Sequence, residues 1–101
     1  MRHIMISSKQ RSYLRSLAHD LEPTVFIGKA GLTENIFKEM ENGFESRELV
    51  KVKLQESAPI TPREAADEIA RRLNGEFVQV IGRKFTLYRQ SKENKKIELP
   101  K

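Results

Sequence analysis

Cysteine is absent from this sequence of 101 residues, which excludes a disulfide framework and any thiolate metal or catalytic site. No apolar run approaches the roughly 20 residues that a membrane span needs. Residues 1–6 are too short for a signal peptide and lack its apolar centre. These absences predict a cytoplasmic protein without membrane contact. We interpret Met1 to Ile4 as a loose extension, with Met5 as an alternative start site.

Groups suited to catalysis are also scarce. The only histidines, His3 and His19, are far in sequence from any plausible serine partner. His19 follows an amphipathic segment, where an imidazole ordinarily interacts with the end of a helix. No histidine or carboxylate spacing indicates a metal site. We therefore expect a protein that is not an enzyme and has no catalytic residue, metal, cofactor or small-molecule substrate.

Repeats and low-complexity linkers are likewise missing, so we expect a single domain over residues 1–101. Its core should span about residues 7–90, and residues 91–101 should form a polar, basic tail. Ile97 and Leu99 are the apolar residues that could anchor this tail. A chain of this length can bury one modest core.

Positive charge is what the chain does have, and its distribution is uneven. Nineteen basic and fourteen acidic residues leave a net charge of +5, which favours polyanionic partners. Residues 1–33 carry +3, residues 49–55 carry +2 and residues 76–101 carry +4, whereas residues 34–48 carry −3. The acidic segment is therefore a poor candidate for contacting phosphate groups.

Apolar periodicity and capping residues predict seven elements. The predicted helices are 8–18, 34–46 and 62–73, and the predicted strands are 24–27, 49–55, 77–81 and 85–89. Ser7 or Ser8 caps the first helix, and Thr61 opens a capping box with proline at the first helical position. A tight turn, Gly82-Arg83-Lys84, joins the last two strands.

The order α-β-α-β-α-β-β predicts an α/β fold, an α+β sandwich with a four-stranded mixed sheet. Two strand-helix-strand units imply parallel strand pairs with right-handed crossovers. The second and third helices should cover one face of the sheet. The strand at 49–55 alternates, so that Lys51 and Lys53 point away from its buried side chains. These lysines indicate that the other face is at least partly open, and the position of the first helix stays undecided.

The stretch from Thr24 to Phe37 combines a short buried strand, a Gly-x-x-Gly loop and a capped helix start. Gly28 and Gly31 enclose Lys29 and Ala30 in this loop. Glycine lets a backbone approach a ligand, and free amides at a helix start suit phosphate. A tight strand-to-helix turn explains the same glycines without any ligand, and glycine turns are common.

Basic residues from separate segments accompany this loop. They are Lys29, Lys51, Lys53, Arg83, Lys84 and Arg89. A solvated surface charge is the simpler interpretation of each one alone, but together they predict a polyanion-binding surface with salt-dependent affinity. Tyr88 or Phe85 could stack on a base, although Phe85 is better suited to the core.

Five sequence blocks occur in an order that resembles a known family. The blocks are K-Q-R-S-Y-L-R-S-L-A-H, V-F-I-G-K-A-G-L-T, E-L-V-K-V-K, Q-V-I-G-R-K-F-T-L-Y-R and K-K-I-E-L-P, spread over roughly 7–100. They resemble the CRM domain (chloroplast RNA splicing and ribosome maturation), most closely its stand-alone bacterial YhbY-type members. The resemblance implies an RNA-binding fold similar to the C-terminal domain of translation initiation factor 3.

The same resemblance implies a partner and a site. The partner is RNA, within precursors of the large ribosomal subunit, and we expect the protein to be a monomer. The family's RNA-contacting loop falls on Gly28-Lys29-Ala30-Gly31. Two alternatives stay open: a module that docks on a ribosomal protein through the acidic second helix, and a small RNA-modifying or hydrolytic enzyme.

Overall fold

The computed structural model describes residues 6–101, and within them the elements follow the predicted order α-β-α-β-α-β-β. The predicted extension from Met1 to Ile4, including His3, and the alternative start Met5 lie outside the described residues. The elements are α1 (Ser8–Ala18), β1 (Val25–Ile27), α2 (Glu34–Arg47), β2 (Leu49–Leu54), α3 (Pro62–Leu73), β3 (Glu76–Ile81) and β4 (Lys84–Tyr88). No boundary differs from its predicted position by more than one residue.

Side-chain caps explain why the helix starts were predictable. Ser7, Thr33 and Thr61 each accept a hydrogen bond from the backbone N–H three residues later, which satisfies one of the free donors at a helix start. The third helix ends at Asn74, whose φ of 58° is left-handed. No helix among residues 6–101 is long and apolar enough to cross a membrane.

The four strands form one mixed sheet in the order β1-β2-β4-β3. The β1 and β2 strands are parallel, whereas β4 is antiparallel to both β2 and β3. The mixed four-stranded sheet is as predicted, and so is the parallel pair of β1 and β2. The second expected parallel pair, β2 with β3, does not form. Because β4 lies between β2 and β3, these two strands share no hydrogen bonds although they run in the same direction.

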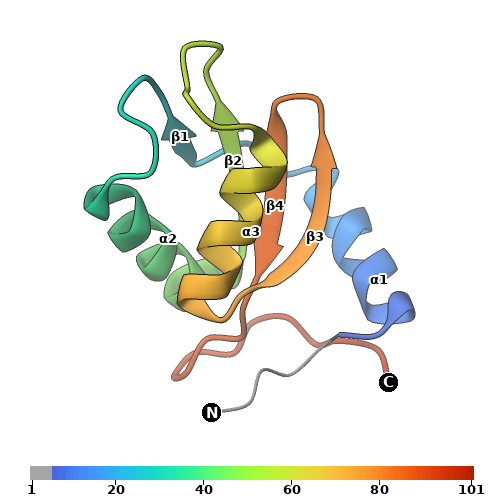
Figure 1. Cartoon of the computed structure of the whole chain (residues 1–101). Helices are drawn as coiled ribbons and strands as arrows, with labels where there is room; N and C mark the ends of the chain where they lie inside the picture. The colour runs from blue at the N-terminus through green and yellow to red at the C-terminus, as the bar shows by residue number, and fades with distance from the viewer. Residues whose placement is uncertain (1–5) are drawn as a thin grey trace.

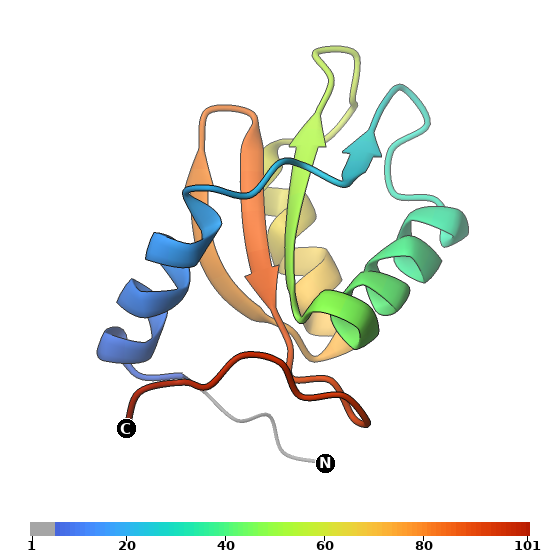
Figure 2. The ribbon, with the colours of Figure 1, turned by 180° about the vertical axis from the view of Figure 1, so that it is seen from behind.

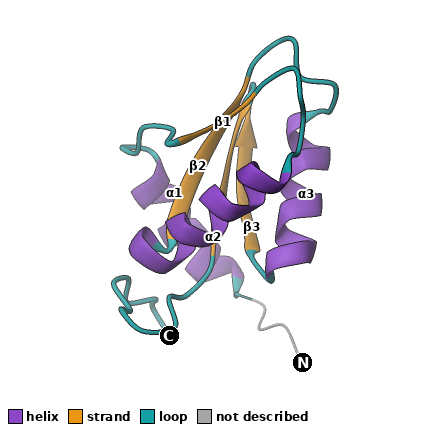
Figure 3. Cartoon of the chain, turned by 90° about the vertical axis from the view of Figure 1, so that its left-hand side faces the viewer, coloured by secondary structure: helices purple, strands orange, loops and turns teal. Residues whose placement is uncertain are grey.

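Helices cover both faces of the sheet. The α2 and α3 helices pack together on one face, as predicted, and α1 packs on the other (Figures 1 and 2). Figure 3 shows the sheet from the side, between α1 and α3. The main core lies between the sheet and the α2–α3 layer, where Met40, Phe44 and Ile69 are fully buried against Val52 and Phe85.

A second, smaller core lies beneath α1 and decides where this helix packs. Leu14 and Ala18 of α1 contact Leu49, Val78 and Tyr88 on the sheet. The C-terminal tail contributes the half-buried side chains of residues 97 and 99, the pair that the sequence suggested as anchors. Figure 2 shows that α1 and the tail cover only part of this sheet face, which we call the α1 face.

Candidate nucleic-acid interface

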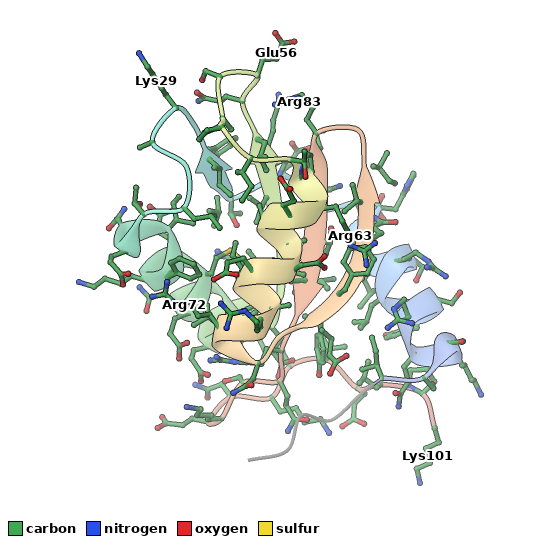
Figure 4. All side chains as sticks on the ribbon, in the orientation of Figure 1. Lys29, Glu56, Arg63, Arg72, Arg83 and Lys101 are labelled. Carbon is green, nitrogen blue, oxygen red and sulfur yellow. The ribbon has the colours of Figure 1, made fainter. Side chains whose placement is uncertain are left out.

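Three loops meet at one end of the sheet, which we call the loop end (Figure 1). They are 28–33, which follows β1, 55–61, which follows β2, and 82–83, which joins β3 to β4. The loops lie together because β1 and β2 are parallel, so that both strands end there, and because the β3–β4 hairpin turns at the same end of the sheet. Lys29, Glu56 and Arg83, one residue from each loop, lie together at this end in Figure 4. The topology therefore brings the predicted loop and hairpin turn to one place.

Gly31 is the glycine of the 28–33 loop that the backbone itself requires. Gly31 is buried, has a φ of +72° and donates its N–H to Gly28 O at 3.0 Å. A Cβ on Gly31 would lie 3.3 Å from Pro59 Cγ, and one on Gly28 would lie 2.8 Å from Gln55 Oε1. The strand-to-helix-turn interpretation thus accounts for Gly31, whereas a side chain at Gly28 would meet only the end of the exposed Gln55 side chain, which can move aside. The loop packs against the neighbouring 55–61 loop.

The accessible part of the glycine loop is its tip. Lys29 and Ala30 are exposed there, and Lys29 points away from the molecule (Figure 4). Leu32 and Thr33 are half-buried, and within residues 6–101 no acceptor contacts their backbone N–H groups. The loop can therefore offer one ammonium group and two amides to an anion.

Lys84 is not in the hairpin turn, as the sequence had suggested, but is the first residue of β4. The turn contains only Gly82 and Arg83, and Gly82 has the φ of +59° that such a two-residue turn needs at its first position. Lys84 lies opposite Lys53 across the β2–β4 pair. Both lysines are exposed on the α1 face, and neither forms an ion pair among residues 6–101.

Lys51 has a structural role that the alternating pattern did not predict. Its Nζ donates to Ala18 O and to Leu21 O, both at 3.1 Å, so the side chain is half-buried. These carbonyls lie at and beyond the C-terminus of α1, where the helix dipole favours a cation. Lys51 therefore holds the end of α1 against the sheet, whereas Lys53 is free to bind a ligand.

Arg83 is exposed but partly engaged. Its Nε donates to Leu54 O at 3.2 Å, and its Nη2 donates to Gln55 O at 2.7 Å. These bonds connect the hairpin turn to the end of β2. The guanidinium group thus adds positive charge to the loop end in a fixed position.

Arg89 lies away from the other predicted residues, just beyond the opposite end of β4. It is five positions along the chain from Lys84, or about 17 Å along an antiparallel strand. Its guanidinium binds Glu41 at 3.0 Å and Glu45 at 2.6 Å, and its side chain is only 14% exposed. Two carboxylates more than neutralise this arginine, so it is unsuited to a phosphate contact at the loop end.

The aromatic residues proposed for stacking are buried. Phe85 is fully buried, as its core interpretation predicted, and Tyr88 lies in the second core at 4% exposure. Phe26 and Ile81 are instead exposed, at 52% and 65%. The sequence suggested that the whole β1 strand is buried, and this prediction is wrong at Phe26. Only Val25 and Ile27 face the core.

The sequence contains only a weak signal for these two exposed residues. A strand of three apolar residues hides its alternation, because each could belong to a core. What exposes Phe26 is its position on the outer strand of the sheet, on the face that α1 leaves partly open.

A hollow of about 670 Å³ lies on this open part of the α1 face. Its lining comes from β2, β3, β4 and the loop end: Lys51, Lys53, Leu54, Gln55, Glu56, Gln79, Ile81, Gly82, Arg83, Lys84 and Thr86. Four cationic groups face one carboxylate here, which makes the hollow electropositive. Its volume falls within the range of about 300–1,000 Å³ typical of small-ligand sites.

Comparison with known proteins identifies the family. The model of the CRS1 / YhbY (CRM) domain matches residues 6–89, most of the chain. The chain belongs to the CRM domain family. The resemblance to this family is thereby confirmed, and the match covers the first four sequence blocks but not the fifth, at 95–100.

Two bacterial relatives of this CRM protein and one solved structure match over nearly their full lengths. It is 38% identical to the probable RNA-binding protein YqeI of Bacillus subtilis, covering 95% of this chain and 100% of the relative. It is 41% identical to a protein of Haemophilus influenzae named RNA-binding protein, covering 95% and 96%. The solution structure of the Staphylococcus aureus protein SAV1595 has a TM-score of 0.79 and 45% identity, over 95% of this chain and 100% of that one. The fold predicted from the sequence is therefore confirmed.

The acidic face of α2 is largely engaged within the CRM domain. Arg89 binds two of its carboxylates, and Arg72 binds Glu34 at 3.0 Å. Glu48 is buried and accepts three backbone hydrogen bonds from the C-terminal tail. Glu39 accepts from Asn35. Within these ion pairs the side chain of Glu34 is still 79% exposed and that of Glu41 40% exposed, so the carboxylates are paired but not all covered. Among residues 6–101, no group of three or more His, Asp or Glu is arranged to hold a metal ion.

Proposed function

We propose that this CRM protein binds RNA at the loop end and the adjoining part of the α1 face. The observation that carries the proposal is that Lys29, at the tip of the glycine loop, lies at the same end of the sheet as the cross-strand pair of Lys53 and Lys84. These lysines come from three segments, are all exposed, and form no ion pair among residues 6–101. The names of the B. subtilis and H. influenzae relatives point to the same class of ligand.

The mode of binding we propose is recognition of the RNA backbone. Lys29 and the amides of Leu32 and Thr33 bind one phosphate at the glycine loop, where Ala30 adds a contact. Lys53, Lys84 and Arg83 continue the positive track across the sheet end. Because phosphate contacts position a protein without reading sequence, selectivity should come from RNA shape or from unpaired bases.

Not every predicted site residue belongs to this track. Arg89 is excluded because Glu41 and Glu45 neutralise it at the far end of β4. Lys51 contributes charge to the hollow while its ammonium group holds the end of α1. Gly31 acts indirectly, by allowing the turn that presents Lys29, and Gly28 leaves the start of the loop without a side chain.

We further propose that the RNA lies in precursors of the large ribosomal subunit, as the YhbY-type resemblance implies. The alternative, docking on a ribosomal protein through α2, is less favoured because Arg72 and Arg89 already pair with three carboxylates of this helix. The two ideas differ in salt dependence, since phosphate contacts release counterions and lose affinity steeply as salt rises.

The binding test compares Lys29→Glu and Lys53→Glu with Lys101→Glu, which reverses an exposed lysine at the opposite end of the molecule (Figure 4). Affinity for transcribed large-subunit RNA fragments is measured by fluorescence anisotropy over a salt series. We expect the first two variants to bind more weakly and to reduce the salt slope by about 0.7–0.9 for each phosphate that the protein no longer binds. Equal effects of all three reversals would contradict a site at the loop end.

The assembly role has a separate test in cells. Lysates are fractionated on sucrose gradients, and the tagged protein is located relative to mature subunits and their precursors. We expect the wild-type protein to sediment with large-subunit precursors, and the Lys29→Glu variant to shift towards the top of the gradient. Sedimentation of the wild-type protein with small-subunit particles, or with none, would reject the assembly role but leave RNA binding standing.

A further inference from the structure

One row of side chains crosses the whole sheet beside the loop end. The strand registers align Phe26 with Lys53, Lys53 with Lys84, and Lys84 with Ile81. Each strand thus supplies one residue, and paired residues project from the same face of a sheet. We call this set the cross-strand row. It lies on the α1 face, because Val25 and Ile27 on either side of Phe26 point into the main core.

The two lysines at the centre of the row lie directly opposite each other on neighbouring strands. Leu54 N–H donates to Arg83 O at 2.8 Å, and these residues form the next opposing pair. Lys53 and Lys84 are therefore a non-hydrogen-bonded pair, the closer of the two kinds in an antiparallel ladder, with Cα atoms about 4.5 Å apart. Like charges in this position destabilise a sheet. A phosphate group bound between the two ammonium groups would remove that repulsion.

The two ends of the row are apolar and exposed. Phe26 is 52% exposed, and Ile81 at the other end is 65% exposed. An aromatic ring on an open sheet face offers a flat surface on which a base can stack. Bases in a duplex are already stacked on each other, so only an unpaired base could use this surface.

The hollow beside the cross-strand row is lined by uncharged polar side chains as well as by cations. Thr86 lies at its floor, fully buried, and its hydroxyl has no hydrogen-bond partner among residues 6–101. An unpaired buried hydroxyl costs free energy. The amide side chains of Gln55 and Gln79 also line the hollow. These two amides offer donors and acceptors to the edge of a base or to a ribose.

We propose that the cross-strand row is a subsite for single-stranded RNA. Phe26 stacks an unpaired base, Lys53 and Lys84 hold the adjoining phosphate, and the hollow receives the neighbouring nucleotide against Ile81. This inference rests on the proposed RNA-binding function and deepens it, because it assigns the selection of unpaired over paired RNA to four named residues.

The test separates stacking from charge. Phe26→Leu keeps an apolar side chain but removes the ring, whereas Phe26→Tyr keeps the ring. Affinities for a short single-stranded RNA and for a duplex of the same length are measured with both variants at constant salt. We expect Phe26→Leu to weaken single-strand binding about tenfold or more, with Phe26→Tyr close to wild type and duplex binding unchanged.

The salt series adds an independent measurement on the same proteins. Phe26→Leu should leave the salt slope unchanged, because the ring binds a base and not a phosphate. The double variant Lys53→Gln/Lys84→Gln should reduce that slope by about 0.7 for a single strand, because the two ammonium groups share one phosphate. Ultraviolet crosslinking of a 4-thiouridine RNA, followed by peptide mass spectrometry, should locate the crosslink in the peptide that contains Phe26.

The outcomes separate this inference from the proposed function. If Phe26→Leu binds single strands as well as wild type while Lys29→Glu does not, the subsite is overturned and RNA binding at the loop end stands. If Phe26→Leu weakens duplex and single-strand binding equally, the ring does not select unpaired bases and the inference also fails. If the wild-type protein binds neither RNA, both proposals fail together.

Discussion

The carboxylate of Glu48 and the backbone N–H of Ser91 lie 2.7 Å apart in the interior of the protein. The other carboxylate oxygen accepts the N–H groups of Lys96 at 2.9 Å and Ile97 at 2.7 Å. Glu48 itself has a left-handed φ of 69°, which turns the chain from α2 into β2. The buried side chain of Glu48 therefore holds the C-terminal tail in place. The tail residues Ile97 and Leu99 can then pack against the second core.

Glu48→Gln should lower the free energy of unfolding by about 2–3 kcal/mol, because an amide offers one acceptor oxygen where the carboxylate offers two. The exposed tail residue Glu93 provides the matched control, Glu93→Gln. Urea denaturation at neutral pH measures both, and amide hydrogen exchange at Lys96 and Ile97 should accelerate only in the first variant. Equal midpoints for the two variants would show that the tail does not depend on Glu48.

Ionisation of the buried Tyr88 phenol should lower the free energy of unfolding at high pH. Burial, with a smaller contribution from the Glu48 carboxylate, raises the pKa of Tyr88 from 10.0 to about 12. The folded protein then keeps the phenol proton at pH values where the unfolded chain has lost it. This contribution is fully present below pH 10.0 and is lost as pH rises through about 12.

Tyr88→Phe should flatten that alkaline decline. The buried hydroxyl has no partner among residues 6–101, so its removal should leave stability at neutral pH unchanged or raise it by up to about 1 kcal/mol. Tyr13→Phe, at a residue 38% exposed on α1, is the control. Urea denaturation over a series of alkaline pH values compares the three proteins. A Tyr88→Phe curve parallel to wild type would contradict the linkage to this residue.

Protonation of the two carboxylates that pair with Arg89 should lower the free energy of unfolding at low pH. Its hydrogen bonds hold the pKa of Glu41 below the usual 4.5. The pKa of Glu45 is also lowered, first by the backbone N–H of Lys92 and then by Arg89. Because both carboxylates have lowered pKa values in the folded state, the stability they contribute is present above pH 4.5 and is lost as pH falls below it.

Arg89→Met should therefore destabilise the protein at neutral pH and weaken its dependence on acid. Arg71→Met is the control, since Arg71 is 70% exposed in its pair with Glu68 and should matter by less than about 1 kcal/mol. Urea denaturation at neutral and acidic pH measures the difference. The folded Arg89→Met protein should also keep its affinity for RNA. A loss of affinity without a loss of structure would return Arg89 to the binding surface.

Lys84→Glu should have opposite effects on stability and on RNA binding. It replaces a repulsive cross-strand pair with an attractive one, so we expect a gain of about 0.2–1 kcal/mol in the free energy of unfolding. RNA affinity should fall in the same protein. A double-mutant cycle with Lys53→Gln isolates the pair, and the stability gain should shrink in high salt. Equal stability of wild type and variant would show that the two ammonium groups do not interact.

Interpretation of the sequence was accurate wherever the signal was local. Helix caps at Ser7, Thr33 and Thr61, and the alternation in β2, placed every element to within one residue. These features depend on neighbours a few positions apart. Assignment to the CRM family was likewise accessible, because whole blocks of sequence are retained in order.

Prediction of the site was less complete, because side-chain roles depend on distant contacts. Arg89 and Lys51 looked like the other basic residues, but one binds α2 carboxylates and the other binds carbonyls at the end of α1. Phe26 looked like a core residue, but its strand lies at the sheet edge. In each case the deciding partner lies in an element far away in the sequence.

The sequence alone therefore determined the class of fold, the order of its elements and the excess of positive charge, since these follow from local pattern and composition. Only the tertiary structure decided that β4 lies between β2 and β3 and that α1 leaves part of its sheet face open. Strand order and helix placement result from packing between segments far apart in the chain. That packing aligns one residue from each strand in the cross-strand row: Phe26, Lys53, Lys84 and Ile81. It also places Arg89 beyond the other end of β4, away from this row.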